Sequence, residues 1–175
     1  MSGLYDIPLS GLKEGSHFYD FDVDRDFFES YDNSEIRKSN IKIRANLVKR
    51  SAHMELTIAV EGRVMILCDR CLGDYWQDIE SSNVLLIKYG DQWEEVDDEV
   101  VMIPYGESSF DLSQFIYEFA HLALPMQRVH SDAINGGSGC DPLMIEKLRE
   151  HLPERDKKTD PRWKDLGKLR GGLEI

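Results

Sequence analysis

Two cysteines separated by two residues form the motif with the clearest chemical meaning in this sequence. Cys68 and Cys71 follow directly on an apolar run at residues 64–67 that is typical of a strand. Two thiolates at this spacing on a turn can face the same tetrahedral metal ion and supply half of a zinc site. His130 and Cys140 are the remaining soft-ligand candidates, and with them the set becomes three cysteines and one histidine, a known composition of structural zinc sites.

The same cysteine pair has two other interpretations. A lone C-x-x-C motif also occurs as a redox pair, or as two half-buried thiols without a chemical role. A thioredoxin-like role is disfavoured, because that chemistry places the pair at a helix N-terminus within a βαβ unit, whereas Cys68 follows a strand. A metal site and inert thiols both remain open on spacing alone.

A basic stretch is the second motif of interest. Residues 36–54 contain six basic side chains and no acidic one, in a chain with 21 Lys+Arg against 33 Asp+Glu. Lys42 and Arg44 alternate with Ile41 and Ile43, so they share one face of a predicted strand. A basic β-ribbon can lie along a phosphate backbone, whereas the simpler interpretation is a solvated face that pairs with acidic neighbours or protects a sheet edge. The candidate nucleic-acid-binding residues are Arg37, Lys38, Lys42, Arg44, Lys49 and Arg50.

Other functional motifs fail on specific residues. Alternating aspartates at residues 20–26 resemble the start of a calcium loop, but its sixth position is Arg25 instead of glycine and its twelfth is Tyr31 instead of glutamate. The sequence contains no nucleophile elbow, no His-Glu-x-x-His motif and no phosphate-binding Walker loop. We therefore predict no catalytic residues and expect that the protein is not an enzyme.

Length and composition indicate a small soluble protein. The 175 residues suffice for one domain with a hydrophobic core, 41 % of them are hydrophobic, and the net charge is −12. The apolar runs are far shorter than the roughly 20 residues that span a bilayer, and no signal-peptide pattern is visible. Three cysteines, an odd number, argue against a disulfide framework. These features predict a cytoplasmic protein without a membrane partner.

The elements that must position these residues are strands in the first half of the chain and helices in the second. Alternating or short apolar runs predict strands at residues 19–23, 36–48, 54–60, 64–67, 84–89 and 100–103, and a short helix at 24–31. Asp111 is a good N-cap for a helix that ends at Pro125. After a glycine-rich loop, further helices are expected at 141–152, with Leu143, Met144, Leu148 and Leu152 as a buried stripe, and at 160–169.

Strands followed by helices, without βαβ alternation, predict an α+β fold: an antiparallel, sheet-rich domain with C-terminal helices. The number of sequential strands is also compatible with a partly closed barrel. We expect a single domain at residues 1–152 and a C-terminal tail at 153–175 that is either flexible or docks.

Charge changes along the chain. Residues 141–175 hold nine basic and eight acidic side chains, so they carry +1 and the first 140 residues carry −13. In the tail, Trp163, Leu166 and Leu169 form a narrow apolar stripe flanked by bases, too small to fold alone. The candidate partner-binding residues are Arg162, Trp163 and Lys164.

The segment Cys68-Asp-Arg-Cys-Leu72, read with the ending Asp160-Pro-Arg-Trp-Lys-Asp-Leu166-Gly-Lys-Leu169, resembles the YceD family, described as a large ribosomal RNA subunit accumulation protein. The resemblance covers nearly the whole chain and includes Ile7-Pro-Leu and the helix-closing Leu124-Pro125. The segment from Arg128 to Pro142 is similar to a Bacteroidetes-like branch of the family.

This resemblance implies a non-enzymatic, cytoplasmic bacterial factor for the processing or accumulation of large-subunit ribosomal RNA and for ribosome assembly. Its partner would be that RNA or a pre-ribosomal particle. In several branches, further cysteines complete a zinc ribbon, and His130 and Cys140 stand in the corresponding region here, which keeps a structural Zn²⁺ open. An acidic adaptor that chaperones a basic ribosomal protein is the alternative, since the charge of −13 would attract a cationic partner.

Overall fold

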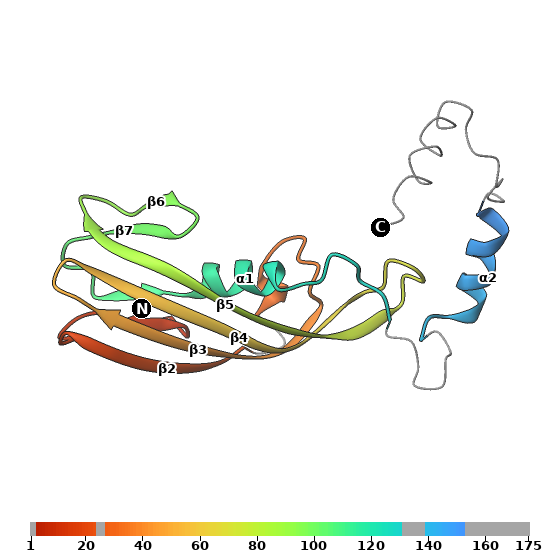
Figure 1. The fold of residues 1–175 in the computed structure, drawn as a ribbon, viewed down its shortest axis with the longest axis horizontal. Coiled ribbons are helices and arrows are strands. Elements are labelled where there is room, and N and C mark those ends of the chain that lie inside the picture. The colour runs from red at the N-terminus through yellow and green to blue at the C-terminus, as the bar shows by residue number, and fades with distance from the viewer. Residues whose placement is uncertain (1–2, 24–26, 131–138, 153–175) are drawn as a thin grey trace, which may run out of the picture. The chain divides into compact units, whose positions relative to one another are not determined.

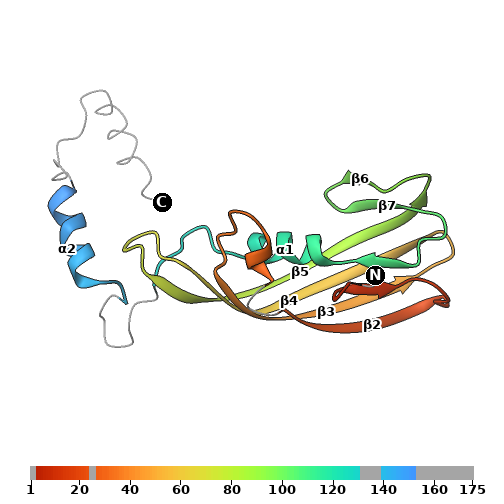
Figure 2. The same cartoon turned by 180° about the vertical axis from the view of Figure 1, so that it is seen from behind.

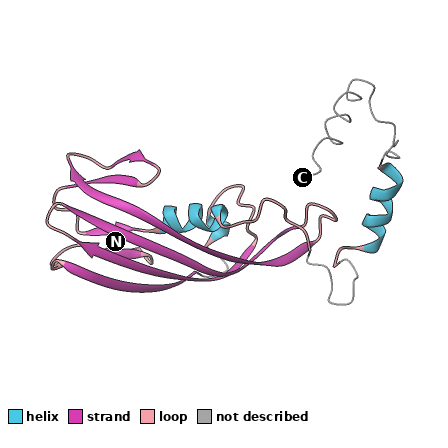
Figure 3. Cartoon of the chain, viewed as in Figure 1, coloured by secondary structure: helices cyan, strands magenta, loops and turns pink. Residues whose placement is uncertain are grey.

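The computed structural model of the chain describes residues 3–23, 27–130 and 139–152. It has the predicted α+β architecture, in which strands greatly outnumber helices (Figure 3). The chain divides into two compact units, Met1–Asp141 and Pro142–Ile175. The strands of the described residues all belong to the first unit, and helix α2 (Pro142–His151) belongs to the second.

Six strands of the first unit form one sheet, which is antiparallel except where β5 pairs with β7 (Figures 1 and 2). Its strand order is β2 (Gly15–Val23), β3 (Lys38–Lys49), β4 (His53–Leu67), β5 (Asp74–Gly90), β7 (Val100–Pro104) and β6 (Glu94–Asp97). Two short strands, β1 (Asp6–Pro8) and β8 (Ser109–Asp111), pair separately. The predicted antiparallel, sheet-rich fold is thus confirmed.

The six-stranded sheet is open, so the expectation of a partly closed barrel is wrong. Its edges are β2, with nine residues, and β6, with four. A barrel closes only when its edge strands pair along their length. Here helix α1 (Ser113–Leu122) packs on one face of the sheet and covers it instead (Figures 1 and 2).

Alternation along the strands separates an apolar inner face, which contacts α1, from a polar outer face. Ile41 and Ile43 of β3 and Ile58 and Ile66 of β4 are buried, as the period of two predicts. Burying one such side chain contributes about 1.5–3 kcal/mol. Helix α1 adds Phe115, Ile116, Phe119 and Ala120 to this core.

Strand β4 is continuous where the sequence predicted two strands. Residues 54–60 and 64–67 belong to one strand of 15 residues, with Gly62 between them. Gly62 has φ +154° and pairs with Ile41 of β3 and Ile79 of β5. A Cβ at this position would lie 2.8 Å from the Cα of Ile41 and would collide with the carbonyl oxygen of Asn40. Glycine therefore allows a close approach of two strands instead of ending one.

Other boundaries also differ from the predicted ones. Strand β5 begins at Asp74 instead of residue 84, because its first half is polar and shows no apolar alternation. Strands β1, β6 and β8 were missed, since three or four residues are too few for a periodic signal. Helix α1 starts at Ser113 with Leu112 as its N-cap, so the predicted N-cap Asp111 lies one residue too early, although its Oδ1 accepts a hydrogen bond from the backbone N–H of Ser113 (2.8 Å). The helix ends at Leu122, before the predicted end at Pro125.

The observed helices agree only in part with the predicted ones. Where a helix was predicted at 24–31, the structure has a 3-10 helix of three residues, Phe28–Ser30, and residues 24–26 lie outside the described residues. Helix α2 lies where predicted, but it has no buried residue, so the expected buried stripe is wrong. Four apolar residues on a short, charged helix make too narrow a stripe for a core. The predicted helix at 160–169 and the candidate residues Arg162, Trp163 and Lys164 lie outside the described residues.

The close approach at Gly62 predicts a large effect of a single methyl group. Gly62→Ala should lower the free energy of unfolding by about 2–4 kcal/mol, because the Cβ meets backbone that cannot move aside. Gly106→Ala is the matched control, since Gly106 also has positive φ (+89°) but no atom lies within 4 Å of its Cβ position. It should cost only about 1 kcal/mol. Equal losses in denaturant titrations would contradict the steric explanation.

Candidate metal centre

The turn between β4 and β5 presents the two cysteines of the C-x-x-C motif on one side. The N–H of Leu72 donates to the carbonyl of Cys68 (2.9 Å), and the N–H of Cys68 donates to the carbonyl of Gly73 (2.9 Å). Leu72 has φ 58°, the left-handed conformation that reverses the chain after Cys71. This tight turn is the end of the long β4–β5 hairpin.

The segment after α1 returns to the same turn and is clamped there. The N–H of Asp69 donates to the carbonyl of Arg128 (2.7 Å), and the N–H of Arg128 donates to Oδ2 of Asp69 (2.9 Å). The guanidinium of Arg128 also pairs with Glu35 (2.6 Å). These bonds bring His130 to the cysteine pair across 59 residues of sequence.

The four predicted ligands lie together with the spacing of a tetrahedral site. All four ligand atoms are within 4.8 Å of one another. The Sγ atoms of Cys68 and Cys140 are 3.7 Å apart, and Nδ1 of His130 lies 3.5 Å from Sγ of Cys71 and 3.6 Å from Sγ of Cys140. A tetrahedral ion with zinc bond lengths requires about 3.8 Å between two sulfurs and about 3.6 Å between sulfur and nitrogen. The cluster therefore fits a metal ion of this size.

The protein environment favours the thiolate form of the cysteine that follows β4. Cys68, Cys71 and Cys140 are all buried. Burial raises the pKa of the Cys68 thiol, but the backbone N–H groups of Cys71, His130 and Arg70, together with the His130 ring, outweigh it and lower that pKa to about 6. A thiolate is the form that binds metal ions.

Surrounding side chains hold the ligands in place. The ring of Tyr75 packs on the His130 ring with 4.9 Å between centroids, and burial raises the pKa of the Tyr75 phenol. Arg37 pairs with Asp74 (3.0 Å), which ties the segment before β3 to the first residue of β5. Such outer contacts orient ligands and are part of a metal site.

The six candidate nucleic-acid-binding residues do not form one patch. Arg37 forms an ion pair with Asp74. Lys49 lies on the same side of β3 as the buried residues, and its Nζ donates a hydrogen bond to the carbonyl oxygen of Leu12 (2.9 Å). Lys42 and Arg44 lie on the outer face of β3, as predicted, and Arg44 pairs with Glu61. Lys38 is the first residue of β3, whereas Arg50 follows the last residue at the opposite end of the strand. Whether these residues bind nucleic acid stays a prediction.

Sequence reasoning missed an aromatic–cation pair on the same outer face. Trp76 of β5 is 44 % exposed, and the guanidinium carbon of Arg63 lies 5.9 Å from the centroid of its ring. Lys38 belongs to the same row, because it pairs with Met65 and Met65 pairs with Trp76. The sequence could not indicate this pair, because residues 74–83 were not predicted to be a strand and the cross-strand neighbour of Trp76 was therefore unknown.

A largely antiparallel sheet, whose longest hairpin ends in a cluster of cysteine and histidine side chains, defines a small α+β protein with a candidate structural metal centre. Residues 56–170 match the family model described as "Large ribosomal RNA subunit accumulation protein YceD". This match spans well over half of the chain and includes all four candidate ligands, and the chain belongs to the YceD family. No curated protein and no solved structure matches the chain significantly. Within the described residues, no helix is long and apolar enough to cross a membrane.

The cluster predicts that each chain binds one divalent metal ion. Co²⁺ added to metal-free protein should produce the visible absorption of a tetrahedral thiolate complex, with saturation at one ion per chain. Cys140→Ser should abolish this absorption and lower the melting temperature of the metal-loaded protein by about 10 °C, because a structural ion contributes folding free energy. His53→Asn, at the other end of β4, is the control and should bind Co²⁺ normally. An unchanged spectrum in Cys140→Ser would rule out this ligand set.

Proposed function

We propose that this chain is a non-enzymatic, cytoplasmic factor for the accumulation of large-subunit ribosomal RNA and for ribosome assembly. The observation that carries the proposal is the family match over residues 56–170. The family description names the accumulation of the large ribosomal RNA subunit, and this role extends to the present chain.

The polar groups of the described residues support a role without catalysis. Among the described residues other than the cysteines, Ser39 is the only polar residue that is buried as a whole. The arrangement most similar to a nucleophile and base is Ser34, whose Oγ lies 3.4 Å from Nε2 of His121. That Oγ also accepts a hydrogen bond from the N–H of Ile36 (3.2 Å), and the His121 ring packs against Tyr117. The Nδ1 atom of His121 contacts the carbonyl oxygen of Tyr117 (2.8 Å), and we propose that these contacts stabilise a turn and a packed ring and do not activate Ser34.

We propose Zn²⁺ as the ion of the metal centre. Three buried sulfurs and the nitrogen of a half-buried histidine, all within 4.8 Å of one another, are the ligand types that zinc prefers in tetrahedral structural sites, and four protein ligands would leave no open position for substrate. The ion would hold His130 and Cys140, which lie on either side of residues 131–138 in the sequence, to the end of the hairpin. Elemental analysis of protein purified without added metal tests this assignment, with iron as the outcome that contradicts it.

The proposed cellular role predicts a measurable RNA imbalance. Cells without this chain should contain less large-subunit than small-subunit ribosomal RNA, and the wild-type gene should restore the balance. Ser34→Ala combined with His121→Asn should restore it equally well, because neither residue has a catalytic role in the proposal. An unchanged RNA ratio in the deleted cells would refute the function, and failure of the double variant with normal protein levels would refute its non-enzymatic character.

For RNA contact we propose the outer face at the end of β3 that lies near the metal centre. Cross-strand rows there hold Lys38, Met65 and Trp76, and then Asn40, Arg63 and Asp78. Exposed aromatic rings stack on unpaired bases, and neighbouring cations bind phosphates. The next row is acidic overall, because Lys42 lies between Asp22 and Glu61, with Glu80 beyond. Phosphate binding is therefore favoured at Lys38 and Arg63 over Lys42 and Arg44.

Two double variants with the same change in charge separate these possibilities. Lys38→Ala with Arg63→Ala should lower the slope of log affinity for ribosomal RNA against log salt by about 2, because two phosphate contacts are lost. Lys42→Ala with Arg44→Ala should lower it by about 1 or less, since acidic neighbours already offset these charges. Equal decreases of the salt slope in both variants would show that the RNA-binding surface continues along β3. An unchanged slope in both variants would show that RNA binds elsewhere.

A second candidate function is an acidic adaptor for a basic ribosomal protein. The observation that favours it is the charge of −13 over the first 140 residues, which would attract a strongly cationic partner.

A further inference from the structure

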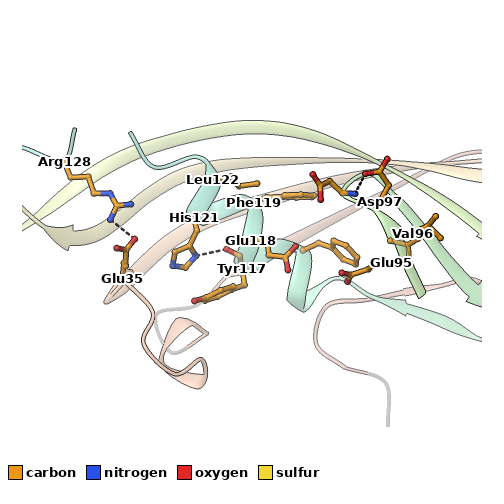
Figure 4. A pocket seen from close by; sticks show the side chains of 13 residues that line it. Glu35, Glu95, Val96, Asp97, Tyr117, Glu118, Phe119, His121, Leu122 and Arg128 are labelled. Atoms are coloured by element: carbon orange, nitrogen blue, oxygen red, sulfur yellow. Dashed lines mark hydrogen bonds and ion pairs between the residues drawn. The ribbon is translucent and has the colours of Figure 1, made fainter. Parts of the chain in front are cut away.

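We propose that a groove between α1 and the β6–β7 edge of the sheet binds a short, basic, amphipathic segment of a partner protein. This inference rests on the adaptor function proposed above and names the surface that would carry it. The groove has a volume of about 940 Å³. Figure 4 shows its two walls, with Tyr117, Glu118, His121 and Leu122 on α1 and Glu95, Val96 and Asp97 on the strand opposite.

The floor of the groove is apolar. Phe115, Phe119 and Val101 line it and belong to the hydrophobic core. Two apolar side chains on its walls are exposed, Leu122 by 74 % and Val96 by 55 %. Single exposed apolar residues are ordinary on a protein surface, but two that border one hollow with a core floor give an apolar ligand a place to be buried.

The rim of the groove is acidic. Its lining contains five carboxylates and one guanidinium, that of Arg128, which already pairs with Glu35. None of the ion pairs between described residues involves the remaining four carboxylates, which are Glu95, Asp97, Asp98 and Glu118. A hollow bordered by unneutralised charges of one sign concentrates the opposite charge. The occupant must therefore be cationic as well as apolar.

Charge complementarity selects among the classes of occupant. RNA and anionic lipid are both repelled by four carboxylates, and a purely apolar ligand would leave those charges partly desolvated. A segment with one or two apolar side chains flanked by lysine or arginine can bury its apolar side chains on the floor and pair its cations with the carboxylates of the rim. Acidic side chains on an edge strand also hinder aggregation, but that role needs neither the apolar floor nor the carboxylate of α1.

The groove and the proposed RNA surface lie on opposite faces of the sheet. Residues of β4 with even numbers point to the inner face that α1 covers, whereas Arg63 and Met65 have odd numbers and belong to the outer face. A basic protein segment in the groove would therefore not compete with RNA on the outer face.

The test uses the full chain and labelled peptides in fluorescence anisotropy. The probe is a peptide of about 12 residues with lysine and leucine at amphipathic helical spacing, compared with a lysine–serine peptide and a glutamate–leucine peptide of the same length. The lysine–leucine peptide should bind best, since it alone carries both features. Equal binding of the lysine–serine peptide would show that charge alone acts and would overturn the groove proposal.

Two triple variants locate the binding. The combined changes Glu95→Gln, Asp97→Asn and Asp98→Asn should lower the affinity for the lysine–leucine peptide by about tenfold. The matched control, Asp20→Asn, Asp22→Asn and Glu80→Gln, makes the same charge change on the outer face and should weaken it by about threefold or less. Leu122→Ser should also weaken binding, and this exposed position can be changed without disturbing the core.

The outcomes separate the groove from the adaptor function. Equal weakening by both triple variants would reject the groove but leave an acidic adaptor with diffuse binding. No binding of any basic peptide by the wild-type chain would reject both. A dimer of the wild-type chain that dissociates in the groove variant would identify a second copy as the occupant and overturn the proposal.

Discussion

The pairing of β4 with β5 is the constraint on which the other parts of the first unit depend. It runs without interruption from His53 opposite Lys88 to Leu67 opposite Asp74. One end of this hairpin carries the turn with Cys68 and Cys71, and the other end carries the parallel partner β7. A register shift of one residue would turn every side chain of β4 to the opposite face. The metal ligands, the apolar core and the outer polar face all require the same register.

The two faces of the six-stranded sheet carry different kinds of side chain. Helix α1 packs on the inner face, and the acidic groove beside β6 opens on the same side of the sheet. The outer face is mostly polar, although Phe18 and Val84 are exposed on it, and it holds its cation–aromatic pair near the candidate metal centre. An acidic chain can therefore present surfaces of different character to different partners, because the sheet keeps them apart. Net charge alone describes neither surface.

The sequence predicted that Cys68, Cys71, His130 and Cys140 would lie together, because candidate soft ligands are recognised by residue type and only three cysteines were available. It also predicted the inner face, since Ile41 and Ile43 alternate clearly with polar residues. It could not predict the first half of β5, where Trp76, Gln77 and Asp78 show no apolar alternation. Nor could it show that Arg37 pairs with Asp74, because cross-strand neighbours follow from register and not from spacing. The acidic run at residues 94–99 was a signal for the groove, but its apolar floor comes from α1.

The positions of the four candidate ligands along the chain determine when they can come together during synthesis. The hairpin supplies two ligands early, whereas His130 and Cys140 are made only after α1. A nascent chain that ends before Cys140 therefore contains the complete six-stranded sheet but an incomplete ligand set. Domains generally fold as their N-terminal parts emerge, and contacts distant in sequence form late. The four candidate ligands would thus come together among the last steps in building the first unit, and an ion bound there would report that the preceding sheet and helix are already in place.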